Sequence, residues 1–162
     1  PEVSDRTAFY AEPSNSIGYL TRIAFRAFSR ALEARTAPYG VSSGQWRFLR
    51  VLWREDGVTQ RELSRRVGMR EPTTVIALKS LEKSGFVVRR KNEADRRKIH
   101  VFLTPTAREL EATLMPAVAE VNAVALAGLT EAETAVLRKA LAQVARNLGV
   151  GDEDEPAADS AV

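Results

Sequence analysis

The sequence contains no cysteine and only one histidine, His100, among its 162 residues. The absence of cysteine excludes disulfide bonds, thiolate zinc ligands and cysteine-based redox sensing. A metal site around His100 would need carboxylates alone to complete it. We therefore expect no metal ion and no cofactor, and a structural role for this histidine.

Long apolar runs are also missing. No stretch of about 18 uninterrupted apolar residues is present, and the first residues lack the basic-then-apolar order of a signal peptide. These absences predict a cytoplasmic protein with no membrane partner. The sequence also has no Gly-rich phosphate loop and no nucleophile elbow, which argues against an enzyme.

Basic charge is concentrated in the middle of the chain. The formal net charge is +3, but the last twelve residues carry five acidic side chains and no basic one, so the remainder has a net charge of +8. Residues 57–104 hold twelve Lys or Arg against five Asp or Glu. Such clustering is typical of polyanion binders, whereas an ordinary solvated surface would disperse its charges.

The length and the hydrophobic content of 44% predict a single domain. Residues 1–14 are expected to form an N-terminal arm and residues 149–162 an acidic, disordered tail. Apolar side chains at helical spacing predict helices over residues 15–36, about 42–55, 106–129 and 130–148. Pro116 should kink the third of these helices or begin a new segment there.

Two shorter helices joined by a tight turn are predicted in the basic region. Thr59 and Glu62 have the spacing of a capping box at the start of the first helix, and Gly68 is expected to end it. Pro72 suits the first turn of the second helix. The buried stripe of that helix is expected to consist of Val75, Leu78 and Leu81. This pair of helices predicts a helix-turn-helix.

After Gly85 the hydrophobic period changes from helical to alternating. Residues 86–91 and 99–103 alternate as strands do, and the polar residues 92–98 lie between them. The pattern predicts a β-hairpin with a long basic tip, with His100 in its second strand. The fold class expected is mainly α, with a small β-wing.

The segment TQRELSRRVGMREPTTVIALKSLEKSGFVVRRKNEADRRKIHVFLT, in this order of elements, resembles the MarR family of winged helix-turn-helix transcription regulators. The resemblance implies a homodimer that binds double-stranded DNA at a pseudo-palindromic operator. It places the winged helix-turn-helix at about residues 42–104 and the dimerisation helices at residues 15–36 and 106–148.

Residues 71–83 are the candidate recognition helix, whose exposed side chains would contact base edges in the major groove. The alternative is that Thr73 and Thr74 serve only the helix N-terminus. The helix before it would supply phosphate contacts. The candidates from the two helices are Gln60, Arg61, Arg65, Arg70, Thr73, Thr74, Ile76, Ala77 and Lys79.

The motif Asp95-Arg96-Arg97 lies at the tip of the predicted wing. The resemblance implies that Arg97 enters the minor groove while Asp95 orients it. A carboxylate that pre-orients an arginine reduces the rotamer entropy lost on insertion into the groove. The neighbouring basic residues would neutralise the DNA backbone, and a solvated charge run is the alternative. These neighbours are Arg89, Arg90, Lys91, Arg96 and Lys98.

The resemblance also implies a small-molecule pocket between the dimer helices and the winged domain, suited to phenolic or aromatic carboxylates. An aromatic wall beside an arginine would fit such a ligand. The candidate residues are Tyr19, Arg22, Arg26, Trp46 and Arg50. A core position for the tryptophan and a solvated face for the arginines are the ordinary alternatives.

The expected function is therefore that of a repressor released by a small aromatic or phenolic acid. Two other functions stay open. A winged helix can act as a protein–protein adapter or as a nonspecific chromosome-organising protein.

Overall fold

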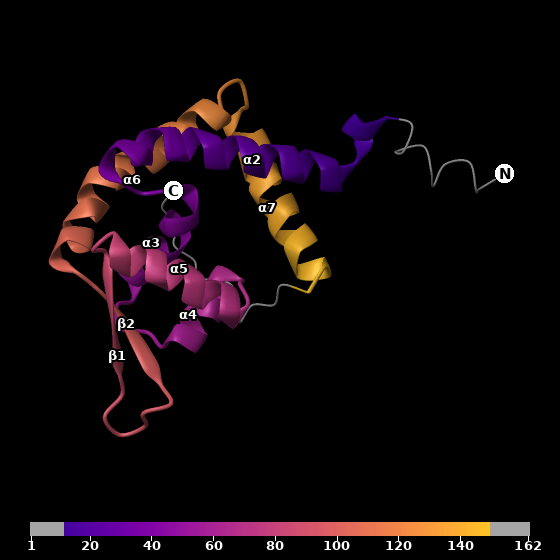
Figure 1. Ribbon diagram of the computed structural model, residues 1–162. Coiled ribbons are helices and arrows are strands. Elements are labelled where there is room, and N and C mark those ends of the chain that lie inside the picture. Colours follow the sequence, from indigo (N-terminus) through magenta and orange to yellow (C-terminus); the bar gives the residue numbers. More distant parts are fainter. Residues whose placement is uncertain (1–11, 150–162) are drawn as a thin grey trace.

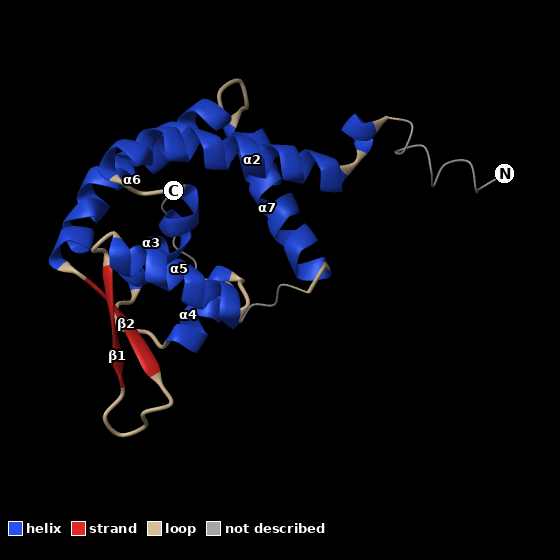
Figure 2. Ribbon diagram, viewed as in Figure 1, coloured by secondary structure: helices blue, strands red, loops and turns tan. Residues whose placement is uncertain are grey.

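The computed structural model describes residues 12–149, so most of the predicted arm and tail lies outside the described residues. The chain forms a mainly helical fold with one small two-stranded sheet, which confirms the predicted fold class (Figures 1 and 2). In chain order the elements are η1 (Pro13–Asn15), α2 (Ile17–Thr36), η2 (Ala37–Tyr39), α3 (Ser43–Arg54), α4 (Gln60–Val67), α5 (Glu71–Lys83), β1 (Val87–Lys91), β2 (Ile99–Leu103), α6 (Pro105–Ala125) and α7 (Glu131–Asn147).

Helix starts follow the polar caps that the sequence indicates. Ser42 and Gln45 form a complete capping box at α3, in which each side chain bonds the other residue's backbone N–H. Thr59 caps α4 by accepting a hydrogen bond from the Glu62 N–H at 3.2 Å. Gly68 ends α4 at a φ of 74°, a left-handed conformation that glycine adopts without steric cost.

Helix α6 contains Pro116 and ends earlier than predicted. Of the two outcomes expected at Pro116, the start of a new segment is excluded because Pro116 lies inside the helix, and α6 ends at Ala125, before residue 129. Proline in a helix interior removes one backbone hydrogen bond, but the remaining turns can continue where tertiary packing holds them. Leu114 and Val121, on either side of Pro116, are buried and supply that packing.

The hydrophobic core lies inside the winged region. Phe48, Leu49 and Leu52 of α3 are fully buried, together with Leu63 of α4 and Leu78 of α5. Leu81, Val101 and Leu114 extend the core to the base of the wing and to α6. The helix-turn-helix is therefore a rigid unit, with α3 packed behind it.

The wing is an antiparallel hairpin whose register runs from Val87↔Leu103 to Lys91↔Ile99. A short stretch before α4 pairs with the other edge of β2, since Val101 N–H donates to the Val58 carbonyl at 2.9 Å. An isolated bridge joins Thr59 and His100 beside this contact. The wing is thus tied directly to the start of α4.

Helix α6 begins beside the base of the wing and packs along α2, both helices contact α3, and α7 leads away from them (Figure 1). No residue of α7 is buried against the rest of the described chain. No helix among residues 12–149 is long and apolar enough to cross a membrane.

Candidate nucleic-acid interface

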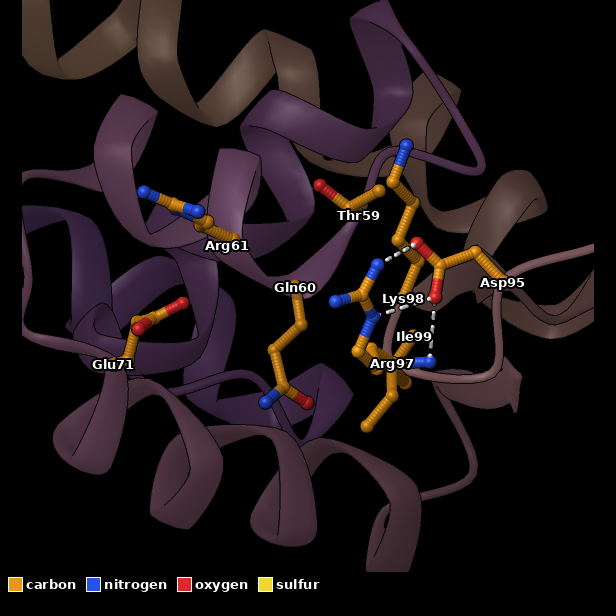
Figure 3. Close-up of a pocket in the computed structure, with 8 residues that line it drawn as sticks. All are labelled: Thr59, Gln60, Arg61, Glu71, Asp95, Arg97, Lys98 and Ile99. Carbon is orange, nitrogen blue, oxygen red and sulfur yellow. Dashed lines mark hydrogen bonds and ion pairs between the residues drawn. The ribbon is translucent and has the colours of Figure 1, made fainter. Parts of the chain in front are cut away.

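A cleft of about 590 Å³ separates the tip of the wing from the helix-turn-helix (Figure 3). The start of α4 and the start of α5 form one side, and the wing tip forms the other. The lining residues are Thr59, Gln60, Arg61, Glu71, Asp95, Arg97, Lys98 and Ile99. Residues from three predicted parts of a DNA-binding surface therefore meet around one cleft.

The Asp95 carboxylate accepts hydrogen bonds from both the side chain and the backbone of Arg97. The Arg97 guanidinium donates to both carboxylate oxygens of Asp95, at 3.1 and 3.2 Å, and the Arg97 backbone N–H donates to Oδ1 at 3.1 Å (Figure 3). The Arg97 side chain is nevertheless 92% exposed. These hydrogen bonds from Arg97 lower the pKa of the Asp95 carboxyl, so the carboxylate is the favoured form.

This geometry contains the pairing that the sequence motif predicts. The arginine is oriented but its guanidinium remains open to solvent, which is what a group awaiting a polyanion requires. The other tip arginine, Arg96, is also exposed.

The turn that presents Asp95 depends on Asn92, which sequence analysis missed. Asn92 Oδ1 accepts hydrogen bonds from the backbone N–H groups of Ala94 at 2.9 Å and Asp95 at 3.1 Å. Asparagine commonly bonds the backbone a few residues ahead in this way, so its position at the start of the polar stretch was the available signal.

The buried stripe of α5 contains Leu78 and Leu81 as predicted, but Thr74 takes the place expected for Val75. Thr74 is 0% exposed, whereas Val75 is only partly buried. The prediction that Thr74 faces DNA is therefore wrong. The buried stripe runs through Thr74, Leu78 and Leu81, which lie on one helix face at spacings of four and three. A threonine methyl group packs as an apolar group, so its polar classification misplaced the stripe.

The remaining α5 candidates are available at the surface. Thr73, Ile76 and Lys79 are exposed, and Ile76 has 70% of its surface accessible. Arg70 is exposed at the N-cap position of the helix. Ala77, in contrast, packs partly against the core.

On α4, Arg61 is exposed while Arg65 is held by a neighbouring carboxylate. Arg65 donates to both oxygens of Glu62, at 2.8 and 3.1 Å, and Arg66 donates to Glu62 at 2.9 Å. Hydrogen bonds from Arg65 and then Arg66 lower the pKa of Glu62 to about 2. Arg66 also pairs with Glu55 at 2.6 Å, which links α4 to the end of α3.

Arg89 is not placed at the surface as a contact to DNA phosphates would be. Its side chain is 22% exposed and donates to Glu82 of α5 at 2.5 and 3.3 Å and to Gln60 of α4 at 3.3 Å. The expected phosphate contact is replaced by an internal link, because the alternation of β1 turns this side chain toward the helices. The same link occupies the Gln60 amide oxygen.

The residues predicted for a small ligand are only partly brought together. Trp46 is buried in the core, with its ring edge-on to Trp53 at 5.2 Å, which is the core position given as the alternative to a ligand-site role. Tyr19 and Arg22 of α2 do meet, with the guanidinium 5.5 Å from the ring centre, and Arg26 and Arg50 are exposed. Sequence analysis missed a second such pair, Arg47 over Phe25 at 5.2 Å.

Metal ligands do not gather in the described part of the chain. Among residues 12–149, no group of three or more His, Cys, Asp or Glu side chains could hold a metal ion.

Comparison with known proteins places this architecture in a family. A family model described as MarR family matches residues 39–98. Transcriptional regulator PA3341, whose crystal structure is known, is 36% identical in sequence to this chain. The match covers 82% of this chain and 98% of the PA3341 chain, with a TM-score of 0.71. The chain belongs to the MarR family.

Two further proteins are similar to this chain. A MarR family transcriptional regulator from Listeria monocytogenes, solved with a 26mer DNA, is 26% identical, with a TM-score of 0.75, and covers 83% of this chain and 89% of that chain. The HTH-type transcriptional regulator TtmR of Methylorubrum extorquens (strain PA1) is 35% identical over 88 residues, which are 54% of this chain and 45% of TtmR. The match thus spans less than half the length of TtmR.

The MarR family match bears on the site as well as the fold. The matched segment begins before α3 and ends at Lys98, so it includes the helix-turn-helix and the Asp95–Arg97 pair. The family consists of transcriptional regulators and not of enzymes, as the sequence predicted.

Proposed function

We propose that the protein is a transcription regulator that recognises a specific sequence in double-stranded DNA. The observation that carries this proposal is Arg97, exposed at the wing tip yet held by Asp95 across a cleft from α5. An arginine in this position suits a narrow minor groove, whose negative potential attracts it. Helix α5 is then the element for the adjacent major groove.

The exposed side chains divide into two kinds of contact. Thr73, Ile76 and Lys79 on α5 reach base edges, where a hydroxyl, an apolar group and an ammonium can each distinguish bases. Arg61, Arg70 and Arg96 contact phosphates, which positions the protein without reading sequence. The relative from Listeria monocytogenes, solved with a 26mer DNA, supports DNA as the partner, because it shares the fold at 26% identity.

The regulator acts as a homodimer. Helix α7 exposes Val136, Leu137 and Leu141 and buries none of its residues within the described chain. Ile17 and Phe25 of α2 add further exposed apolar surface. A second copy of the chain would cover these faces, and its two-fold symmetry requires a pseudo-palindromic DNA site with half-sites about 10 base pairs apart.

The test is selection of duplexes from a random-sequence pool, followed by titration of the selected and of a shuffled duplex. A specific regulator binds the selected duplex at least about a thousandfold more tightly than the shuffled one at the same salt. Equal affinities would instead indicate a nonspecific chromosome-organising protein. Absence of DNA binding would favour a protein–protein adapter.

We further propose that the protein is a cytoplasmic repressor released by a small aromatic acid. The support is the pair of arginine–aromatic contacts, Arg22 with Tyr19 and Arg47 with Phe25, since such pairs can take a carboxylate and a ring together. Thermal-shift titration with benzoate and 4-hydroxybenzoate tests this effector class. Binding should weaken DNA affinity by about 1–3 kcal/mol of coupling. If neither acid shifts the melting temperature or the DNA affinity, this effector class is excluded.

A further inference from the structure

The His100 side chain joins the helix-turn-helix to the tip of the wing. Its Nδ1 lies 2.8 Å from the carbonyl oxygen of Gly57, in the segment between α3 and α4. Its Nε2 lies 3.1 Å from the amide nitrogen of Asn92, where the wing tip begins. A carbonyl oxygen can only accept a hydrogen bond, so Nδ1 carries a proton and donates it to Gly57.

The orientation of the Asn92 amide is set by two other contacts. Its oxygen already accepts from the backbone N–H groups of Ala94 and Asp95, so its nitrogen must be the atom that faces His100. That nitrogen donates, and Nε2 must therefore accept. Only the neutral imidazole, with its proton on Nδ1, satisfies all of these hydrogen bonds at once.

Asn92 closes the turn that carries the DNA-facing pair. The Asn92 backbone N–H donates to the Lys98 carbonyl at 2.9 Å, and the Lys98 N–H donates to the Asp95 carbonyl at 3.0 Å. The Asn92 side chain holds the Asp95 backbone, and the Asp95 carboxylate holds Arg97. A continuous set of hydrogen bonds thus runs from Gly57 to the exposed arginine.

We propose that His100 and Asn92 are positioning residues for Arg97, and that protonation of His100 releases the wing tip. Protonated Nε2 would carry an N–H that faces the two N–H groups of the Asn92 amide. The Asn92 side chain then turns away, or flips its oxygen toward His100, and in either case leaves the Ala94 and Asp95 N–H groups. The consequence for DNA rests on the proposed function, whereas the release of the tip does not.

The charged groups around His100 do not supply another acceptor for the added proton. Arg90 is its direct partner on β1, and Lys91 and Glu93 line the same shallow hollow as His100. Asp56 precedes Gly57, but its carboxylate accepts from the Gly57 N–H, the Leu103 N–H and Arg108. Among residues 12–149, Glu93 makes no hydrogen bond to His100, and the Asp95 carboxylate bonds Arg97.

The proposal predicts that lower pH weakens specific DNA binding, whereas simple electrostatics predicts that lower pH strengthens it. A positive charge gained at His100 would strengthen binding to any DNA, because it adds attraction to the phosphates. Release of the tip instead weakens the binding that depends on an oriented Arg97. Lower pH should therefore reduce affinity for a selected duplex without reducing affinity for a shuffled one.

The first experiment needs no DNA. Two-dimensional ¹H–¹⁵N NMR of the intact protein follows the Ala94 and Asp95 amides as the pH is lowered until the His100 ring protons report the charged imidazole. Both amides should move with the midpoint of the His100 ring, and in Asn92→Ala this linked movement should disappear. Amides that stay in place while the ring titrates would overturn the proposal.

The second experiment measures affinity for a duplex selected from a random pool. Between neutral pH and the pH at which the NMR experiment shows His100 to be protonated, the wild type should lose about three- to tenfold in affinity, the equivalent of one hydrogen bond. Asn92→Asp should show the reverse, because its second oxygen accepts from protonated His100 while the first still holds the two N–H groups. Ala94→Asp adds the same charge to the exposed tip without touching His100, so it should keep the wild-type direction.

An identical pH dependence in wild type and Asn92→Asp would overturn the proposal. Circular dichroism at both pH values confirms that each variant is folded. If no duplex is enriched from the pool, the proposed function fails, while the NMR experiment still decides whether His100 controls the tip.

Discussion

Arg89 on β1 binds both carboxylate oxygens of Glu82 on α5, so the wing is fastened to the end of the recognition helix. The same guanidinium reaches Gln60 at the start of α4. One half-buried side chain thereby sets the relative position of the three elements that border the DNA-facing surface. This link turns Arg89 from a surface charge into part of the scaffold.

Arg89→Ala should therefore lower the free energy of unfolding by about 1–2 kcal/mol, because Glu82 loses its partner in a partly buried setting. Affinity for a selected duplex should fall more than affinity for shuffled DNA, since the wing and α5 lose their fixed spacing. Urea unfolding and paired DNA titrations measure both effects. If stability is unchanged and both affinities fall equally, with a salt slope lower by about one, Arg89 is a simple phosphate contact.

Asp95→Ala should weaken binding to a selected duplex even though it removes a negative charge near DNA. The reason is that Arg97 loses its bidentate partner and must be ordered on binding. The expected loss is about three- to tenfold, and Arg97→Ala should lose at least as much and also its preference for A·T-rich flanks. Fluorescence anisotropy with matched duplexes provides the measurement. Equal or tighter binding by Asp95→Ala would show that its charge matters more than its orienting contact.

Thr74→Val should leave DNA binding unchanged and raise stability slightly, by about 0.5–1 kcal/mol. Thr74 is fully buried, and neither its hydroxyl nor that of Ser64 has a hydrogen-bond partner among the described residues. An isosteric methyl removes the cost of burying that oxygen. Thr73→Val, on the exposed face one residue earlier, is the matched control and should weaken specific binding instead. A binding defect in Thr74→Val, with Thr73→Val unaffected, would show that Thr74 contacts DNA as first predicted.

Glu62 should stabilise the fold above acidic pH and lose this effect as the carboxylate is protonated. Its pKa is lowered to about 2 by Arg65 and Arg66, so the contribution is present above the ordinary value of 4.5 and is lost as pH falls toward 2. Glu62→Gln should cost no more than about 1 kcal/mol at neutral pH, because the pair is partly exposed. Denaturant unfolding at neutral and acidic pH should show the two proteins converging at the acidic end. A constant difference would mean that the Glu62 charge is not the cause.

Leu137→Glu on α7 should convert the dimer to a monomer at micromolar concentration, since a carboxylate would be buried in the apolar contact. Lys139→Glu, an exposed charge change two residues away, is the control and should remain dimeric. Multi-angle light scattering reports both masses. A monomeric wild type would remove the basis for a two-fold DNA site.

The sequence by itself determined the local structure. Ser42, Thr59 and Thr130 cap helices where their hydroxyls can take up free backbone N–H groups, and alternating apolar residues specify the wing. The Asp95–Arg97 contact was expected from the resemblance to the MarR family, and it joins two residues of one turn. Each of these features depends on groups only a few positions apart.

Only the tertiary structure decided which side chains face the core and which ones bind a partner far away in the chain. Thr74 is buried in place of Val75, and Trp46 lies in the core, because of how neighbouring elements pack against them. The bonds from Arg89 to Glu82 and from His100 to Gly57 join positions whose separation in the chain carries no periodic signal. Each depends on how α3, α4, α5 and the wing pack together. A side chain's local pattern fixes its element, but the packing of several elements fixes its environment.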